Sequence, residues 1–369
     1  MEEESELTEN VAGSKAYLVI FYSLMILRFL PNIRTAKPTD TTGYTWGKPY
    51  AFSNIMKSVF NKEVLHIAID DIVAERWIVS DDKTMGSKVI MKHGPVSFSE
   101  ILGKHGEELL GSKHFNHFGP HLGIVMKLID THPDKNKGSL SVQVHPAQNH
   151  PTIPSKPEVW LGKGSFYLGF KDNLSDAEIL SAVYDGTLEQ HLNLIICDTK
   201  QKLCVRGGLT HAIRHNSFLY EWSNSPTIGE IAKGGLADAT IGLYDKTDGK
   251  VPRPGKEKPE LALEVIKHAN LNDGDEEEQV NTILYSDNNC SHVRLFDFEG
   301  LVVERITLSG EYKLATSHGT AFYVESGVVR LDDEVFGEGE EGFIGYHTKA
   351  VKFIPQSEVV IVYLYHRQN

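Results

Sequence analysis

The sequence predicts a mainly β protein with a few helices, ending in a second, smaller all-β domain. Short apolar runs of strand length, bounded by turn residues, begin near residue 64 and include 74–80 and 88–91. After residue 281 such runs recur at regular spacing with glycine turns between them, and no helical pattern interrupts them. Regularly spaced short strands are typical of a sandwich or a barrel.

Composition places the chain among ordinary globular proteins. Its 369 residues suffice for two domains, and 40% hydrophobic with 24% charged residues is a common balance. The net charge of −13, with no basic stripe, argues against nucleic-acid binding. An odd number of cysteines, whose spacings fit no metal or disulfide motif, suits a reducing compartment and predicts a cytoplasmic protein: Cys197, Cys204 and Cys290.

We predict three parts along the chain. Residues 1–42 form an N-terminal extension, partly disordered, with an apolar segment at 16–30; 43–275 form the larger domain with helical insertions; 281–369 form the all-β domain. The uncharged stretch 16–27 is too short to cross a bilayer core of about 30 Å as a helix. A buried strand pair or core helix is therefore the favoured interpretation, with membrane attachment through residues 16–30 and disorder as the alternatives.

Three segments have helical patterns. The first, 97–110, has Ser99 as an expected cap and Gly111 as a stop. The second opens with the capping box Ser175-x-x-Glu178, and helical character continues through 188–192. The third covers 258–270. These helices are insertions in, or additions to, the β framework.

One candidate metal site stands out. Gln143 and His145 are two residues apart in a β-branched run, so in a strand their side chains leave the same face. Glu158, thirteen residues on, and His211, in a glycine turn, can complete the set. Two histidines, a carboxylate and an amide suit Zn, Mn or Fe better than Ca. A polar patch inside a β-barrel is the alternative that the residues alone leave open.

The later histidines show no such grouping. They are scattered through the last domain and are expected to be surface or hydrogen-bonded residues: His292, His318 and His347. That domain is therefore predicted to act as support or assembly surface.

Several segments occur in an order that carries a family resemblance. They are residues 74–80 (AERWIVS), 126–130 (MKLID), 140–146 (LSVQVHP), 156–160 (KPEVW), 208–213 (GLTHAI), 219–221 (LYE), 242–245 (GLYD) and 252–254 (PRP). In this order they resemble the motifs of type I mannose-6-phosphate isomerases (phosphomannose isomerases), cupin proteins, in the family's shorter form. The resemblance implies a cupin jelly-roll-like barrel with inserted helices, followed by a cupin-like all-β domain.

The resemblance also implies a reaction. Mannose 6-phosphate, a small sugar phosphate, would interconvert with fructose 6-phosphate through a cis-enediol, a step that serves GDP-mannose biosynthesis. One metal ion per chain, usually zinc, would be held by Gln143, His145, Glu158 and His211. Two further residues match positions that line the family's site and are the candidates for substrate positioning and acid–base work: Lys127 and Glu221.

The chain departs from the family pattern at three positions. Gly242 stands where the family has an arginine, Gly207 replaces a proline, and Arg214 replaces a glycine. We therefore predict that Arg214 supplies the missing cation, with Arg206 and Lys233 as other candidates. The alternative is a catalytically weakened or altered-substrate sugar- or sugar-phosphate-binding cupin. A metal-dependent oxygenase is a third class that such a ligand set allows.

Overall fold

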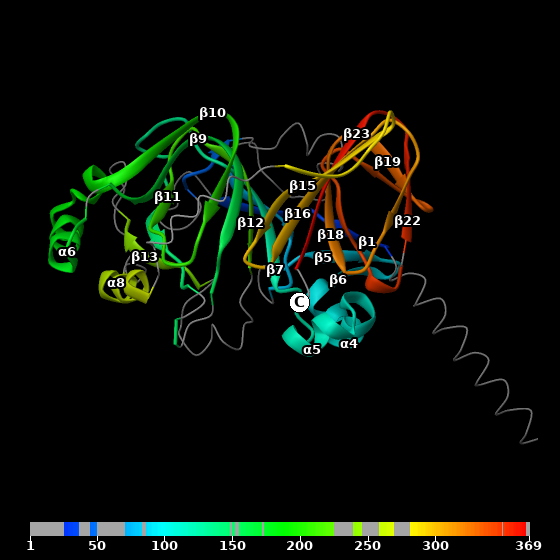
Figure 1. The fold of residues 1–369 in the computed structure, drawn as a ribbon, viewed down its shortest axis with the longest axis horizontal. Helices are drawn as coiled ribbons and strands as arrows, with labels where there is room; N and C mark the ends of the chain where they lie inside the picture. Colours follow the sequence, from blue (N-terminus) through cyan, green and yellow to red (C-terminus); the bar gives the residue numbers. More distant parts are fainter. Residues whose placement is uncertain are drawn as a thin grey trace, which may run out of the picture.

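A computed structural model describes residues 26–36, 45–49, 71–82, 86–147, 150–151, 155–171, 173–224, 239–245, 258–268, 281–348 and 350–366. The predicted mainly β class is confirmed, because two large sheets and one small sheet make up most of these residues. Figure 1 shows two β-rich halves side by side, with helices at one end and beneath the other half.

The first large sheet has ten strands. Its main path runs β13-β8-β11-β9-β12-β7-β4-β2, with β10 paired to β9 and β3 paired to β4. The strands are β2 (Asn32–Ala36), β3 (Lys48–Pro49), β4 (Ile72–Val79), β7 (Ile124–Asp130), β8 (Val142–Val144), β9 (Glu158–Phe170), β10 (Leu192–Val205), β11 (His211–Ile213), β12 (Phe218–Asn224) and β13 (Ile241–Tyr244). Strands far apart in the sequence are neighbours in this sheet, which brings the predicted metal ligands within reach of one another.

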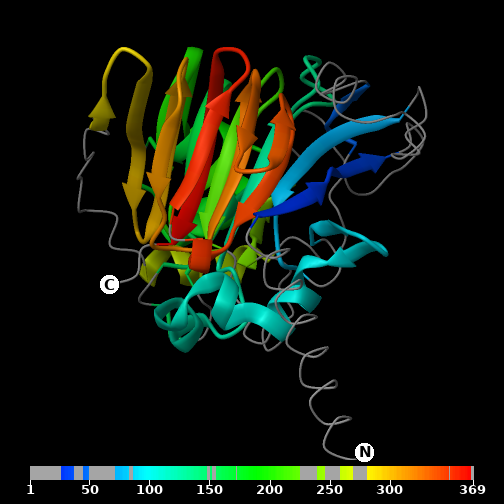
Figure 2. The ribbon, with the colours of Figure 1, turned by 90° about the vertical axis from the view of Figure 1, so that its right-hand side faces the viewer.

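The second large sheet has nine strands in the order β14-β15-β16-β23-β18-β21-β1-β5-β6 and belongs to the half of the molecule that is nearer to the viewer in Figure 2. They are β1 (Ile26–Leu30), β5 (Lys88–Met91), β6 (Gly94–Ser97), β14 (Thr282–Ser286), β15 (Cys290–Phe298), β16 (Leu301–Leu308), β18 (Thr320–Ser326), β21 (Glu341–Ile344) and β23 (Val359–His366). A four-stranded sheet packs on it through a shared apolar core: β17 (Tyr312–Ala315), β19 (Val328–Leu331), β20 (Glu334–Gly337) and β22 (Ala350–Pro355).

Apolar side chains from both large sheets share one core. Met126, Leu128 and Trp222 of the ten-stranded sheet lie in the same buried cluster as Val303 and Leu364 of the nine-stranded sheet. Burying such side chains contributes roughly 1.5–3 kcal/mol each to stability. One face of the ten-stranded sheet is therefore packed against the C-terminal half, and its other face is available for a functional site.

Sheet pairing crosses the boundaries predicted from the sequence. β1, at the end of the apolar segment, pairs with β21, and β5 pairs with β1, so both join the C-terminal sheet. β1 buries Leu27 and Phe29 and exposes the residues between them more, as a strand should. Residues 16–25 lie outside the described residues. In the part of the chain that the structure describes, no helix is both long and apolar enough to span a membrane.

The helices largely follow their sequence signals. α6 (Asp176–Asp185) has the predicted capping box between Ser175 and Glu178, and α8 (Pro259–His268) falls within the third helical segment. α4 (Phe98–Leu110) ends at Gly111 as predicted, but its N-cap is Ser97 and not Ser99. Two short helices, α5 (Ser112–Phe118) and η4 (Tyr346–Thr348), had no sequence prediction, and the continuation after α6 is the 3-10 turn η1 (Leu188–His191).

Candidate metal centre

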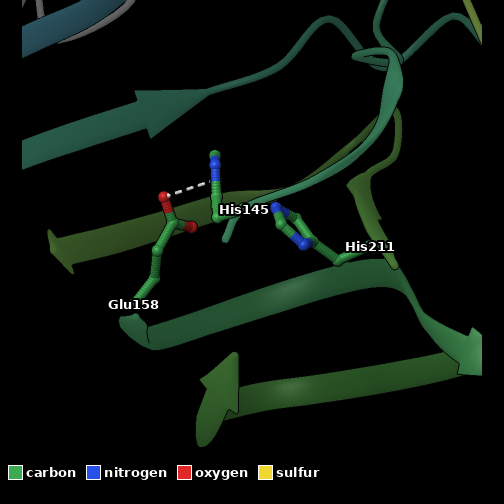
Figure 3. A group of neighbouring side chains, drawn as sticks. All are labelled: His145, Glu158 and His211. Atoms are coloured by element: carbon green, nitrogen blue, oxygen red, sulfur yellow. Dashed lines mark ion pairs between the residues drawn. The ribbon is translucent and has the colours of Figure 1, made fainter. Parts of the chain in front are cut away.

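Three predicted ligands meet in the ten-stranded sheet. His145 follows β8, Glu158 begins β9 and His211 begins β11, which pairs with both of those strands. One ligand atom from each lies within 4.8 Å of the other two, and all three residues are buried (Figure 3). The cross-strand pairing explains this convergence, since residues on adjacent strands can be close in space despite long separation in sequence.

Both histidines have the orientation that a metal ligand needs. His145 Nδ1 donates to the carbonyl oxygen of Ala239 at 3.1 Å, and His211 Nδ1 donates to that of Leu209 at 2.8 Å. A proton on Nδ1 leaves the Nε2 lone pair available to a cation. His145 Nε2 is buried and has no hydrogen-bond partner among the described residues, although Glu158 Oε1 lies 3.1 Å away. This orphaned nitrogen fits a divalent metal site.

Gln143 completes the predicted set. It is paired with His211 in the β8–β11 ladder, and its Nε2 lies 3.3 Å from His211 Nε2. A half turn of the amide group presents Oε1 to the same point, because the two ends of a glutamine amide are nearly the same shape. The structure therefore brings together all four residues predicted as metal ligands.

Glu158 is held in its charged form. Lys156 Nζ and His145 Nε2 each lie 3.1 Å from its Oε1, and Trp160 Nε1 donates to its Oε2 at 2.9 Å. Burial alone raises the pKa of Glu158, but the charge of Lys156 and the contact with His145 outweigh it and hold that pKa well below its usual range. Lys156 and Trp160 were only motif landmarks in the sequence, although their spacing of two from Glu158 already predicts a shared face.

His211 is held neutral. Burial, and then the nearby His145, lower its pKa to about 4, while Glu158 opposes the shift. A neutral imidazole is the form that binds a metal ion. The centre thus combines an ionised carboxylate with a neutral histidine, a combination suited to Zn²⁺.

A second polar group lies on neighbouring strands. Lys127 of β7 pairs with Glu221 of β12, and Lys127 Nζ lies 3.0 Å from Glu221 Oε1 with both residues buried. Burial and the charge of Glu158 raise the pKa of Glu221 to about 7, while Lys127 lowers it. A carboxyl group with a pKa near neutrality can both accept and donate a proton at physiological pH.

Trp77 and Glu75 of β4 extend this group. Lys127 Nζ lies 4.8 Å from the centroid of the Trp77 ring, and Trp77 Nε1 donates to Glu75 Oε2 at 2.6 Å. In the sequence, these two residues stand out only as part of a motif. Their spacing of two, inside an apolar run, is the signal that could have placed them on the site face.

The structure places Arg214, the residue predicted to supply the missing cation, against Tyr167. Its guanidinium carbon lies 4.7 Å from the ring of Tyr167, which packs with α6 and α8 in a separate core. Arg214 directly follows β11, and Tyr167 pairs with Ala212, whose side chain leaves the face of the sheet opposite to that of His211. Gly242, where the resembling family has an arginine, pairs with Gln143 and so adjoins the predicted metal ligands.

Of the two other cation candidates, the structure describes Arg206 alone. Arg206 stacks over Phe298 of the C-terminal half, with its guanidinium carbon 5.8 Å from the ring. Lys233 lies outside the described residues. The cation for a sugar phosphate therefore has no assignment within the described part of the chain.

Gly207 shapes the turn that carries His211. A Cβ there would lie 2.3 Å from the carbonyl oxygen of Pro146, and the neighbouring Gly208 N donates to His145 O at 2.6 Å. We expect Gly207→Ala to push the His145 and His211 turns apart and to weaken zinc binding by about 10–100-fold, as for other residues that orient ligands. Competition with a zinc chelator measures this affinity.

The matched control is Gly103→Ala in α4. Its added Cβ meets nothing within 4 Å, and alanine favours a helix over glycine by up to about 1 kcal/mol. This control should bind zinc as the unchanged protein does and should melt no earlier. Equal zinc affinity in the Gly207→Ala and Gly103→Ala proteins would show that the turn does not orient the ligands.

Comparisons with known proteins were made on sequence and on structure. No protein-family model matches the sequence, and no curated protein matches it. Three solved structures are similar. Mannose 6-phosphate isomerase from Bacillus subtilis has a TM-score of 0.67 and 17% sequence identity, and the match covers 92% of this chain and 99% of that chain. A mutant of phosphomannose isomerase from Salmonella typhimurium has a TM-score of 0.65 and 14% identity, covering 93% of this chain and 99% of that chain, and a zinc-bound mannose 6-phosphate isomerase has a TM-score of 0.63 and 13% identity, covering 93% and 100%. At such identities the likeness shows the fold. The predicted cupin fold is confirmed.

Proposed function

We propose that the chain is a zinc-dependent aldose–ketose isomerase that interconverts mannose 6-phosphate and fructose 6-phosphate. One observation carries the proposal: the buried group of His145, Glu158 and His211, on a fold shared with mannose 6-phosphate isomerases. The adjoining Lys127–Glu221 pair adds the acid–base chemistry that such a reaction needs.

Four residues would hold the metal: Gln143, His145, Glu158 and His211. When bound, a zinc ion supplies Lewis acidity that polarises the oxygens of the substrate. The carbonyl groups of Ala239 and Leu209 fix the two imidazoles, so that both Nε2 atoms keep their lone pairs for the metal. Lys156 and Trp160 fix the carboxylate of Glu158 in the same way.

Glu221 is the proposed acid–base group. The reaction moves one proton between C2 and C1 of the sugar and a second between the oxygens on these carbons, and Glu221 would accept and then return the first. A pKa of about 7 leaves Glu221 able to do both near neutral pH. Lys127 holds the Glu221 carboxylate at 3.0 Å and has further N–H groups with which to bind a sugar hydroxyl.

A second candidate function is binding without rapid turnover. Two observations favour it: Gly242 stands beside Gln143 where the resembling family has an arginine, and Arg214 lies on the other face of the sheet. Loss of one contact to developing charge typically costs about 10²–10³ in rate. Such a protein would keep its metal and still bind a sugar or sugar phosphate.

The test is an assay of the zinc-loaded full chain with mannose 6-phosphate, coupled to detection of fructose 6-phosphate. Glucose 6-phosphate and unphosphorylated mannose serve as comparison substrates. We expect turnover of mannose 6-phosphate that exceeds that of the other two at least tenfold. Calorimetric binding of mannose 6-phosphate without turnover, in protein that contains one zinc per chain, would instead support the binding function.

We also propose a cytoplasmic location. All three cysteines are free, and the two that are buried, Cys197 and Cys290, have pKa values raised by burial, which keeps them as thiols. Unpaired thiols suit a reducing compartment. Fractionation of cells that produce the native protein tests this proposal, and recovery with membranes would contradict it.

A further inference from the structure

Site residues of the ten-stranded sheet alternate with residues that face the C-terminal half. On β4, Trp77 lies beside Lys127 and donates to Glu75, while Arg76 between them reaches the nine-stranded sheet. β12 repeats this arrangement, because Glu221 faces Lys127 while its neighbour Tyr220 reaches the other sheet. On β4 and on β12, a polar contact to the C-terminal half thus lies one residue away from a site carboxylate.

Arg76 makes the more buried of these contacts. Its guanidinium donates to the carbonyl oxygen of Gly339 and to the carboxylate of Glu341, and both side chains of the pair are 1% exposed. The guanidinium carbon also lies 5.6 Å from the ring of Tyr323. Two acceptors on one turn hold the arginine fork in a defined position, which a single contact would not do.

The pair is poorly arranged for stability alone. Arg76 Nε, Glu341 Oε1 and the Tyr323 hydroxyl are buried without a hydrogen-bond partner among the described residues. Buried polar atoms without partners cost free energy, and apolar side chains of similar volume often replace a buried ion pair without loss of stability. The contact therefore calls for a role other than stabilising the core.

A chain of contacts leads from this pair to the site. Arg76 fixes the backbone of β4 on one face, and Trp77 on the other face lies against Lys127, which binds Glu221. The second contact supports the same carboxylate from β12: the Tyr220 hydroxyl donates to Glu325 Oε1 at 3.1 Å. Glu325 itself pairs with two cations, Lys200 of β10 at 2.9 Å and Arg305 of β16 at 3.0 Å.

We propose that Arg76 is a positioning residue, through which Glu341 of the C-terminal half sets the place of Trp77, Lys127 and Glu221. The C-terminal half is then part of the catalytic apparatus without touching the substrate. The kinetic part of this inference rests on the proposed isomerase function, whereas the placement of Trp77 can be measured without any activity.

The test is the double variant Arg76→Met/Glu341→Met, which replaces the ion pair by apolar side chains of similar length. We expect its melting temperature to stay within a few degrees and its zinc content to stay at one per chain. kcat for mannose 6-phosphate should fall about tenfold with little change in KM, because misplaced acid–base groups affect the chemical step. The Trp77 indole N–H, one of four such NMR signals, should exchange with solvent faster.

Two further variants complete the experiment. Arg28→Met is the matched control. Arg28 of β1 contacts Glu340, next to Glu341, and stacks over Phe336, but it contacts none of the site residues named above. This variant should leave kcat and the exchange of the Trp77 indole N–H unchanged. Arg76→Lys keeps the positive charge but loses the forked guanidinium. We expect it to lower kcat and to speed the exchange of the Trp77 indole N–H, each by about threefold. This variant takes the place of the double variant if that one does not fold.

Three outcomes decide the inference. Unchanged kcat and unchanged Trp77 exchange in the variants would overturn it, as would equal effects of Arg28→Met and Arg76→Lys. Faster exchange at Trp77 with the Trp160 indole signal unchanged would support it. If the unchanged protein has no isomerase activity, the proposed function fails, while the comparison of Trp77 exchange still decides whether Arg76 positions the site.

Discussion

The double substitution His145→Ala/His211→Ala is expected to remove bound zinc and to lower isomerase turnover by about 10³ or more. It deletes both nitrogen ligands and leaves Glu158 and Gln143, which are too few to hold zinc at a tetrahedral site. A bound metal supplies several kcal/mol of transition-state stabilisation, and each 1.36 kcal/mol is a factor of ten in rate. Zinc content and kcat/KM of the purified variant measure both effects.

His117→Ala is the control for this experiment. His117 is an exposed histidine in the last turn of α5, so its loss should leave zinc content and turnover as they are. Both variants should keep the melting profile of a folded protein when zinc is absent. Zinc that stays bound at one per chain in the double variant would show that the metal, if any, sits elsewhere.

The second large effect is expected from Glu221→Gln. Glutamine has nearly the same shape but cannot take up a proton, so kcat should fall by about 10²–10⁴, the usual share of a general acid–base group. Zinc content should stay unchanged because Glu221 is not a proposed ligand. The exposed Glu311→Gln is the control and should keep full kcat.

The same variant changes how stability depends on pH in the metal-free protein. The ordinary pKa of 4.5 applies to the unfolded chain, and folding raises the pKa of Glu221 to about 7. Between these values the folded protein holds a proton that the unfolded chain has released, so stability from this group falls as pH rises. Glu221→Gln lacks this titration. Its free energy of unfolding, measured relative to that of the unchanged protein, should therefore rise by roughly 1–3 kcal/mol between pH 4.5 and 7.

Urea unfolding of the two metal-free proteins at several pH values measures that difference. Other groups, including His211 and Glu341, titrate in both proteins. Where the substitution does not change their pKa values, their contributions to the free energy of unfolding cancel in the comparison. A constant difference between pH 4.5 and 7 would mean that Glu221 is ionised throughout this range and is not the proposed acid–base group.

Much of the site follows from the spacing of residues in strands. Gln143 and His145 are two apart and share a face, as do Lys156, Glu158 and Trp160, whose contacts the structure shows. The same rule, applied more fully, predicts the placement of Arg214. It lies three residues after His211, so in continuous strand geometry it leaves the opposite face.

The partners of strands could not be predicted in this way. Nothing in the residues of β1 or β5 indicates that they pair with the C-terminal sheet, because local pattern predicts a strand but not its neighbour in space. The same limit hid the contact between Arg76 and Glu341, which are 265 positions apart. His292, predicted to be a surface or hydrogen-bonded residue, is indeed hydrogen-bonded: its Nε2 lies 2.8 Å from Glu304 Oε2, inside the C-terminal half.

The most direct test of the account follows the reaction itself. The zinc-loaded full chain is incubated with mannose 6-phosphate in D₂O, and the sugar is observed by NMR before and after the zinc is removed with a chelator. We predict conversion to fructose 6-phosphate that stops on chelation and resumes when zinc is restored. Protein that carries one zinc per chain at His145, Glu158 and His211 and still leaves mannose 6-phosphate unchanged would contradict the account.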